Sequence, residues 1–454
     1  MTSIHPIPSV TRKDDIAYIM SCVQEGHCCS IVGVSNIGKS ALLRSLCRPD
    51  VQATYLGQSA GEFIFTYVDL NFMLGTSEQG FYELVLRDLT RALEGAGADA
   101  SLVERIRDAH AQVVNPSSEF VVPLRFNESL LALGEGLGRQ VVFLFDEFDA
   151  VFQQLDARIF LNLRALKDRY ARTLSYVTAT AYPLPQLRAG RETDEFCELF
   201  SHHTRYLAPL SEGDARLYLA DRARPTDPKL KEQDIAFIIR TAGGHPGLLD
   251  ATYQATIAAK EEARHIRGTD EIHYEAVREK LHGDINVRTE CAKLWSDLSE
   301  DEQLSLLALV MGTGEATPQA KAALREKHIL INENQTLSPL FTAFVERQGL
   351  ARRDRPRGVR LDVEAGDVYV DGELVPPLTE LEFRLMLLLY GNMDKICDKY
   401  SIVEAVWGES YIDQVDDARI EKLIGRLRQK IEPDPLNPKY LITIRGRGYK
   451  LVSR

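Results

Sequence analysis

The residues best suited to chemistry lie early in the chain, in the octapeptide GVSNIGKS at 33–40. Its glycines, lysine and serine follow the spacing G-x-x-x-x-G-K-S, directly after the strand-like run CCSIVGV and directly before a helical pattern. In such a loop, backbone N–H groups wrap phosphates, the lysine neutralises β/γ oxygens and the hydroxyl binds Mg²⁺. We therefore predict a site for ATP or ADP with Mg²⁺, formed by Gly33, Asn36, Gly38, Lys39, Ser40 and Ala41.

A second acidic element supports this prediction. The apolar run VVFLF at 141–145 is followed by Asp146 and Glu147, where the carboxylates of a Walker B strand are expected. Asp146 would hold Mg²⁺ together with Ser40, and Glu147 would orient or deprotonate an attacking water. The alternative is a solvated acidic strand end. Thr178 and Thr180 close the next strand-like run, where they would face the γ-phosphate, although threonine is common in strands for structural reasons.

The elements that must position these residues alternate between strand and helix. A helix is predicted over 13–24, and further strands over 63–70, 141–145, 174–180 and 203–210. This alternation predicts an α/β fold with a mostly parallel sheet, here that of a P-loop NTPase.

Beyond residue 210 the pattern becomes helical. Ser211 and Asp214 resemble a capping box at the start of a helical lid, and Ser299 and Glu302 repeat that signal in a later segment, where helices and a short strand predict a winged-helix module. An Arg-rich stretch containing Pro and Gly predicts a linker. The predicted order is a core (1–210), a helical lid (211–285), a middle winged-helix-like module (286–350), a linker (351–357) and a second winged helix (358–454).

Residues 1 to about 350 resemble the STAND branch of the AAA-like P-loop ATPases and, more loosely, archaeal origin-recognition proteins. The matching strings are VTRKDDIAYIM, GVSNIGKS, FLFDEFD, VTATAYP and GGHPGLLD. The resemblance implies that Gly244, His245 and Pro246 come near the nucleotide, with His245 touching the phosphates of ADP. The alternative is a helix that begins at a proline beside a surface histidine. Arg188, Arg191 and Arg205 follow the fourth strand, but none can be assigned as an arginine finger.

The net charge of −12 argues against a nucleic-acid partner, yet its distribution reverses that conclusion. Residues 415–454 hold ten Lys and Arg against five Asp and Glu. A basic end on an acidic chain is typical of a nucleic-acid-binding segment.

The predicted helix over 416–431 has two distinct faces. Ile420, Leu423, Leu427 and Ile431 recur at helical spacing, while Arg419, Lys422, Arg426 and Gln429 occupy another face. Such a helix can pack through one face and enter a major groove with the other, where Arg forks to guanine and Lys or Arg reaches phosphate. A charged, solvated helix face is the alternative.

Residues from about 358 to 453 resemble the C-terminal effector domain of OmpR/PhoB-type response regulators, through the strings VYVDGELVPPLTELEFRLMLLL, IVEAVWG, IEKLIGRLRQKIEPDP and ITIRGRGYKLV. The resemblance implies binding to double-stranded DNA. Arg445 and Arg447 would lie at the tip of the wing, near backbone phosphate or a narrow minor groove. Trp407 and Tyr449 are expected in the core. The residues expected to contact DNA are Arg419, Lys422, Arg426, Arg428, Arg445 and Arg447.

The sequence departs from that family in two ways. No receiver domain with a phospho-acceptor Asp precedes the effector segment, and Gly425 thins the basic pair of the recognition helix. Base preferences therefore cannot be transferred.

Bulk composition limits the remaining possibilities. Seven cysteines without paired spacing predict reduced thiols in the cytoplasm, and the apolar runs are too short for a membrane span. We expect a slow ATPase acting as a switch on DNA binding, with self-association and a protein or small-molecule inducer. The alternatives are a DNA-loading ATPase of replication or transposition and a nucleotide-gated defence or signalling scaffold.

Overall fold

The computed structural model describes residues 10–333, 335–354, 358–363, 366–408, 411 and 415–452. The chain divides into two compact units, Met1–Glu346 and Arg347–Arg454.

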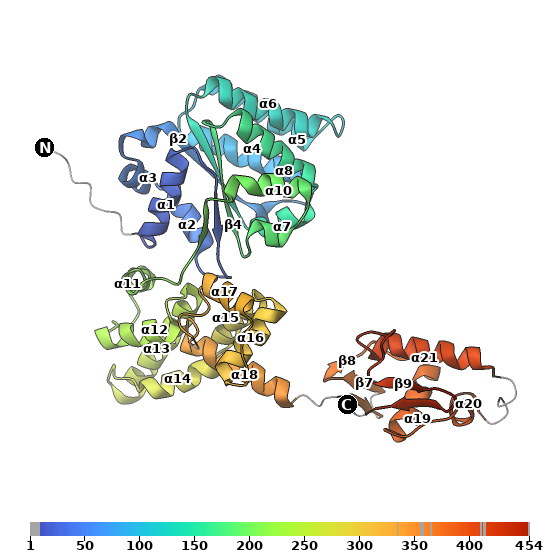
Figure 1. The fold of residues 1–454 in the computed structure, drawn as a ribbon. Helices are drawn as coiled ribbons and strands as arrows, with labels where there is room; N and C mark the ends of the chain where they lie inside the picture. Colours follow the sequence, from blue (N-terminus) through green and yellow to red (C-terminus); the bar gives the residue numbers. More distant parts are fainter. Residues whose placement is uncertain are drawn as a thin grey trace. The chain divides into compact units, whose positions relative to one another are not determined.

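A parallel β-sheet forms the centre of the first unit (Figure 1). Within the described residues it has five strands, in the order β2-β3-β4-β1-β5. All five predicted strands are present, but the last is shorter than the predicted 203–210, where Pro209 has no N–H for a strand ladder. The strands are β1 (Cys29–Val32), β2 (Phe63–Asp69), β3 (Gln140–Asp146), β4 (Leu174–Thr180) and β5 (Thr204–Tyr206).

The two faces of the sheet feed two different cores. Along β3, Val142 and Leu144 join the core that also contains side chains of α1 and α2, whereas Phe143 and Phe145 join the opposite core. This period of two is what a strand buried on both faces requires. The first face is covered by α1 (Lys13–Gln24), α2 (Lys39–Leu46) and α3 (Pro49–Leu56). The second face is covered by α4 (Glu78–Gly95), α5 (Ala100–Val114), α6 (Val121–Gly136), α7 (Phe148–Gln154), α8 (Ala157–Arg169), α9 (Leu184–Leu187) and α10 (Arg191–Cys197). Short 3-10 turns occur between these elements at η1 (Gly57–Glu62), η2 (Leu70–Phe72) and η3 (Glu198–Phe200).

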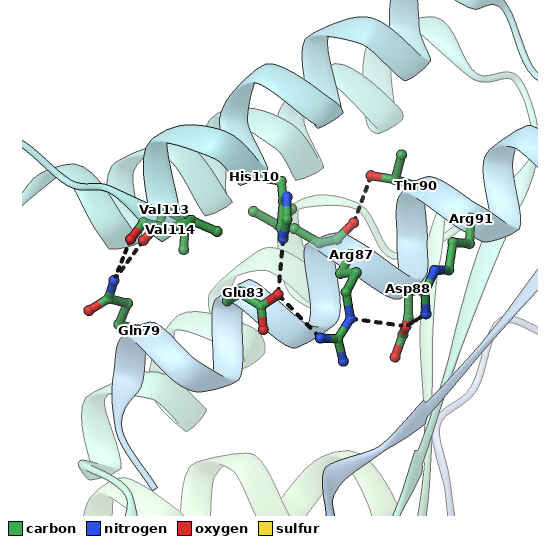
Figure 2. Close-up of polar contacts among 10 residues, drawn as sticks. Gln79, Glu83, Arg87, Asp88, Thr90, Arg91, His110, Val113 and Val114 are labelled. Carbon is green, nitrogen blue, oxygen red and sulfur yellow. Dashed lines mark hydrogen bonds and ion pairs between the residues drawn. The ribbon is translucent and has the colours of Figure 1, made fainter. Parts of the chain in front are cut away.

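Polar contacts fix α4 against α5 on that second face (Figure 2). The Glu83 carboxylate lies 3.1 Å from His110 Nε2 and also accepts from Arg87. At the start of α4, the Gln79 amide donates to the carbonyl of Val113 at the end of α5, at 2.9 Å. These bonds hold the helical layer that backs β2 and β3.

A helical lid follows the sheet. It consists of α11 (Glu212–Arg222), α12 (Glu232–Ala242), α13 (Pro246–Arg267) and α14 (Tyr274–Gly283). The Ser211 hydroxyl accepts from the backbone N–H of Asp214 at 3.1 Å, so α11 begins where the capping signal predicts.

The middle module contains α15 (Ile285–Ser296), α16 (Glu300–Met311), α17 (Pro318–Glu326) and α18 (Pro339–Asp354). The capping box of Ser299 and Glu302 is present, and the predicted short strand is a single antiparallel bridge between Leu330 and Thr336. The predicted linker over 351–357 starts too early, because α18 continues to Asp354, and the rest of that segment, 355–357, lies outside the described residues. Arginine is a good helix former, so a run of charge does not by itself end a helix.

Close backbone contacts join the lid to its neighbours at two glycines. Gly243 and Gly244 have φ values of 68° and 78°. A Cβ at Gly243 would overlap the carbonyl of Leu337, and one at Gly244 would overlap the carbonyl of Leu210. The Ser338 hydroxyl also donates to the carbonyl of Thr241 at 2.8 Å. The end of α12 therefore lies directly against the backbone of the middle module.

In the described part of the second unit, a small sheet, three helices and a terminal hairpin follow the end of α18. Its elements are β6 (Val359–Asp362), β7 (Asp367–Val370), β8 (Glu373–Leu374), α19 (Glu380–Gly391), α20 (Lys399–Trp407), α21 (Asp417–Ile431), β9 (Leu441–Ile444) and β10 (Gly448–Leu451). Asp371 and Gly372, at φ of 50° and 85°, make the turn between β7 and β8.

None of the helices in the described ranges combines the length and apolar character that crossing a lipid bilayer requires.

Candidate functional site

The predicted phosphate loop connects β1 to α2. Gly38 has a φ of 104°, which favours glycine, and directly precedes α2. A Cβ at Gly33 would come within 2.7 Å of the Ile37 side chain, so this position also favours glycine. Lys39 is buried, and its ammonium donates to the carbonyls of Gly33 at 2.7 Å and Val34 at 3.3 Å. The lysine therefore folds back over its own loop.

The acidic residues after β3 occupy two different environments. Asp146 is only 1% exposed and accepts a hydrogen bond from the Tyr67 hydroxyl at 2.6 Å. Glu147 is exposed and has a left-handed φ of 55° at the start of α7. Desolvation raises the pKa of the Glu147 carboxyl, against the opposing charge of Lys39. A raised carboxyl pKa beside a phosphate loop is suited to proton transfer.

Two buried groups lie next to these carboxylates. The Asp149 carboxylate accepts from the backbone N–H of Ala181 at 2.9 Å, and burial raises its pKa. Thr180 is buried, and its Oγ1 has no hydrogen-bond partner within the described part of the chain. Thr178, in contrast, donates to the Ser30 hydroxyl at 3.2 Å, which gives it a structural role.

A cavity of about 670 Å³ opens beside the loop and collects many of the predicted residues. Among the predicted residues, its wall contains Asn36, Gly38, Lys39, Ser40, Ala41, Glu147 and Pro246, whereas Gly33, Asp146, Thr180 and His245 lie outside the lining. Lid residues such as Tyr218, Arg222 and Asp250 complete the wall. This volume is within the range of small-molecule and cofactor sites.

His245 does not have the role that the resemblance implies, nor is it the surface residue of the alternative. Its ring is fully buried before α13, Nε2 lies 2.9 Å from the carbonyl oxygen of Ser35, and Nδ1 accepts from the backbone N–H of Leu248 at 3.3 Å. Burial lowers its pKa to about 4, so the ring is neutral near pH 7. Both ring nitrogens are used within the protein, and His245 therefore fastens the lid to the phosphate loop. The predicted helix start at Pro246 is confirmed.

Arg12 is a loop contact that sequence reasoning missed. It is 6% exposed, has a left-handed φ of 63°, and donates to the carbonyls of Ile37 at 2.5 Å and Ala208 at 2.9 Å. Burial lowers the pKa of its guanidinium, against the raising effect of Asp15. The string VTRKDD contained this residue and was the available signal.

Two carboxylates of the middle module also reach the loop, without any signal in the sequence pattern. Asp297, at the end of α15, accepts from the backbone N–H of Ser35 at 2.5 Å and from its hydroxyl at 3.0 Å. Glu290, within α15, accepts from the Asn36 side-chain amide at 2.7 Å. The loop is thus held from the N-terminal segment, the lid and the middle module.

Two of the three arginines after the fourth strand make polar contacts within the fold. Arg188 donates to the carbonyl of Leu155 at 2.5 Å, and Arg205 pairs with Asp15 at 2.9 Å. Neither becomes an arginine finger on this geometry.

The residues present fit a magnesium nucleotide. The α2 N-terminus with its glycine-bearing loop suits phosphates, and the Ser40 hydroxyl and the Glu147 carboxylate, which line the same cavity, are oxygen groups of the kind that Mg²⁺ binds.

In the second unit, α21 presents the predicted two faces. Ile420, Leu423, Leu427 and Ile431 are buried. Arg419, Lys422, Arg426 and Gln429 are exposed. Asp416 caps the helix by accepting from the backbone N–H of Arg419 at 3.0 Å. The basic face is thus available on a helix anchored through its apolar side.

Arg428 does not fit the predicted set of DNA contacts. Its guanidinium donates to the carbonyl of Leu441 at 2.7 Å and 2.9 Å and to the Thr443 hydroxyl at 2.9 Å. These bonds tie α21 to β9. Arg428 follows Arg426 by two positions, which is about 200° around the helix, so it lies on a different side from the exposed face, and composition alone does not reveal this.

The terminal hairpin carries its two arginines as predicted. Arg445 and Arg447 are exposed between β9 and β10, with Gly446 at a φ of 70°. A Cβ at Gly448 would overlap the carbonyl of Cys397, so the glycine allows close packing. Tyr449 is buried, and Trp407 packs against the same core, as expected.

Known proteins resemble the second unit in sequence. Residues 373–451 match the family described as transcriptional regulatory protein, C terminal. The sensory transduction protein RegX3 of Mycolicibacterium smegmatis is 41% identical over 93 residues, which are 20% of this chain and 40% of that protein. The probable transcriptional regulator ycf27 of Cyanidium caldarium is 39% identical over 101 residues, 21% of this chain and 40% of its own length. The chain thus spans about 40% of these relatives.

Solved structures resemble both units. The Walker-type ATPase of Pyrococcus abyssi aligns with 74% of this chain and 95% of its own, at 13% identity and a TM-score of 0.45. The DNA-binding domain of Klebsiella pneumoniae RstA, solved with the RstA box, aligns with 21% of this chain and 93% of its own, at 25% identity and a TM-score of 0.20.

The sequence match and the fold described above agree for the second unit, and the sheet order with its phosphate loop characterises the first. Residues 373–451 thus belong to the OmpR/PhoB-type family of transcriptional regulatory C-terminal domains, carried here in one chain with a P-loop ATPase-like fold.

Proposed function

We propose that this chain is a cytoplasmic transcription regulator in which bound ATP or ADP controls binding to double-stranded DNA. The observation that carries the proposal is one chain that holds both a phosphate loop beside a cavity and an exposed basic helix face in a regulator-type domain. The match of residues 373–451 to a transcriptional regulatory domain favours this function over the alternatives, a DNA-loading ATPase and a nucleotide-gated scaffold.

On the nucleotide side, the backbone N–H groups from Gly33 to Ala41 and the Lys39 ammonium would hold the phosphates. Ser40 and Asp146 would hold Mg²⁺, which withdraws charge from the phosphate oxygens when bound. Glu147 is exposed at the cavity with a raised pKa, and its role is to take a proton from water. Phosphate-loop proteins that act as switches hydrolyse slowly, and we assign this chain the same slow ATPase activity.

On the DNA side, Arg419, Lys422 and Arg426 enter the major groove, and Arg445 and Arg447 contact the backbone or the minor groove. Support comes from their exposure and from the anchoring of α21 through its apolar face.

A nucleotide switch needs contacts that differ between two states. His245, Asp297 and Glu290 contact the phosphate loop, and these contacts would change when the bound nucleotide changes from ADP to ATP. Self-association, or an inducer that binds the middle module, would couple this change at the phosphate loop to a change in DNA binding.

The test is a selection of bound DNA sequences, followed by gel-shift titrations of the full-length protein without nucleotide, with ADP and with a slowly hydrolysed ATP analogue. We expect DNA affinity to differ among the three states. Equal affinity in all three would remove the switch and favour the scaffold, and loss of all salt-dependent DNA binding would remove the regulator itself.

A further inference from the structure

The Asp297 carboxylate occupies a position on the phosphate loop that suits an anion. Its two oxygens accept from the backbone N–H and the hydroxyl of Ser35, at 2.5 Å and 3.0 Å. Both donors belong to the loop whose N–H groups bind phosphate in proteins with this motif. Asp297 is 9% exposed, so water does not compete strongly for the contact. A carboxylate of the protein thus uses donors that a phosphate oxygen would use.

The cavity presents only part of the loop. Residues from Asn36 to Ala41 line it, but Ser35 does not. Glu290 is in the wall, with one carboxylate oxygen on the Asn36 amide at 2.7 Å and the other 2.8 Å from the Lys293 ammonium. A ligand in this cavity therefore meets the N-terminus of α2 on one side and the Glu290 carboxylate beside Asn36 on the other, while the donors of Ser35 are bonded to Asp297.

The ammonium of Lys39, which is predicted to neutralise the phosphates, points back onto its own loop in this conformation, whereas Glu290 already pairs with Lys293. Lys39 donates to the carbonyls of Gly33 and Val34. Like charges at close range oppose each other strongly where water is partly excluded. Placing an additional phosphate group at the Ser35 end of the loop therefore costs more free energy, in this conformation, than placing it at the α2 end.

We propose that Asp297 and Glu290 make this conformation selective for a nucleoside diphosphate, and that a triphosphate binds only when α15 withdraws both carboxylates from the loop. This inference rests on the proposed nucleotide site. It assigns the discrimination between ADP and ATP to two residues of the middle module, more than 250 positions beyond the loop in sequence.

The test compares Asp297→Asn, Glu290→Gln and the double variant with wild type in the full chain. Both substitutions remove charge and keep a side chain of similar size. Affinities for fluorescent ADP and for a slowly hydrolysed fluorescent ATP analogue, each with Mg²⁺, are measured by titration. We expect wild type to favour ADP. The double variant should shift the ratio of affinities toward the ATP analogue by about tenfold, within the usual span of coupling between sites.

The control is Glu315→Gln, an exposed acid of the same module, which should leave the ratio unchanged. An unchanged ratio in the double variant, or an equal gain for both nucleotides, overturns the inference while the nucleotide site survives. If wild type binds neither nucleotide, the proposed function fails and the inference falls with it.

Hydrogen exchange on the wild-type chain gives a second readout that needs no variant. The peptide containing Ser35 and the peptide containing the end of α15 should stay protected with ADP and lose protection with the ATP analogue. Equal protection of both peptides in the two complexes contradicts the proposal, even where a variant fails to fold.

Discussion

The His245 ring and the carbonyl oxygen of Ser35 are 2.9 Å apart, which joins the start of lid helix α13 to the phosphate loop. The same ring accepts from the backbone N–H of Leu248, so it serves as a helix cap and as a loop contact together. Only the neutral ring can do both, because a protonated imidazole has no acceptor nitrogen.

Acid should therefore weaken the first unit. Burial holds the pKa of His245 at about 4 in the folded protein, against about 6.5 in an unfolded chain. Stability from this residue is complete above about pH 6.5 and is lost as pH falls toward about 4, by roughly 3 kcal/mol in total. Thermal melting across this range should show a smaller acid loss for His245→Gln than for wild type. Parallel curves for the two proteins would show that His245 does not titrate as described.

Two substitutions at the nucleotide site should separate binding from hydrolysis. Lys39→Ala should lower nucleotide affinity strongly, because it removes the charge on the phosphates. Glu147→Gln should bind ATP and release little phosphate, because only the base is lost. Fluorescent-nucleotide titration and phosphate-release assays distinguish the two, and normal hydrolysis by the Glu147 variant would exclude its assigned role.

The exposed arginines of the second unit should carry DNA affinity. Arg426→Ala and Arg445→Ala should each weaken DNA binding without changing nucleotide affinity. A base contact is worth about 1 to 3 kcal/mol, and a lost phosphate contact should flatten the salt dependence. Gel shifts over a salt series measure both effects, and wild-type behaviour in both variants would reject the groove-facing assignment.

Arg428→Ala provides the matched comparison on the same helix. Its guanidinium bonds β9, so the variant should lower the melting temperature of the domain. The exposed variants should melt like wild type. A wild-type melting temperature for Arg428→Ala, with weakened DNA binding, would return this residue to the contact set.

The segment from Gly358 to Arg454 should fold and bind DNA alone. Its core, which includes Val359, Leu385 and Leu451, is confined to this part of the chain. Its DNA affinity should not respond to nucleotide, whereas that of the full chain should. The chain after residue 350 holds 18 basic and 18 acidic residues, so the whole charge of −12 precedes it and can mask the basic face. A fragment without cooperative thermal unfolding would show that it depends on the first unit.

Local sequence patterns were sufficient to predict the helices and strands and to identify the phosphate loop. The predicted helix over 13–24 matches α1, and β4 has the predicted bounds of 174–180. Apolar periodicity also identified the buried face of α21. These features depend on neighbours along the chain, which a sequence displays directly.

Contacts between distant segments were not predictable in the same way. Asp297 and Glu290 lie among many acidic residues, and nothing in their spacing marks them as partners of Ser35 and Asn36. His245 was identified as a residue of interest but given the wrong partner, because its burial depends on how the lid packs. Arg428 and Arg426 differ only in which side of one helix turn they occupy.

The two glycines at the end of α12 have a mechanical consequence. At Gly243 and Gly244 the backbone of the lid lies directly against that of Leu337 and Leu210, and no side chain separates the two backbones. A displacement of the middle module should therefore move α12, and with it His245, by nearly the same amount. His245 and Asp297 should then leave the loop together, so the lid and the middle module move as one rigid unit and their contacts with the loop do not break independently.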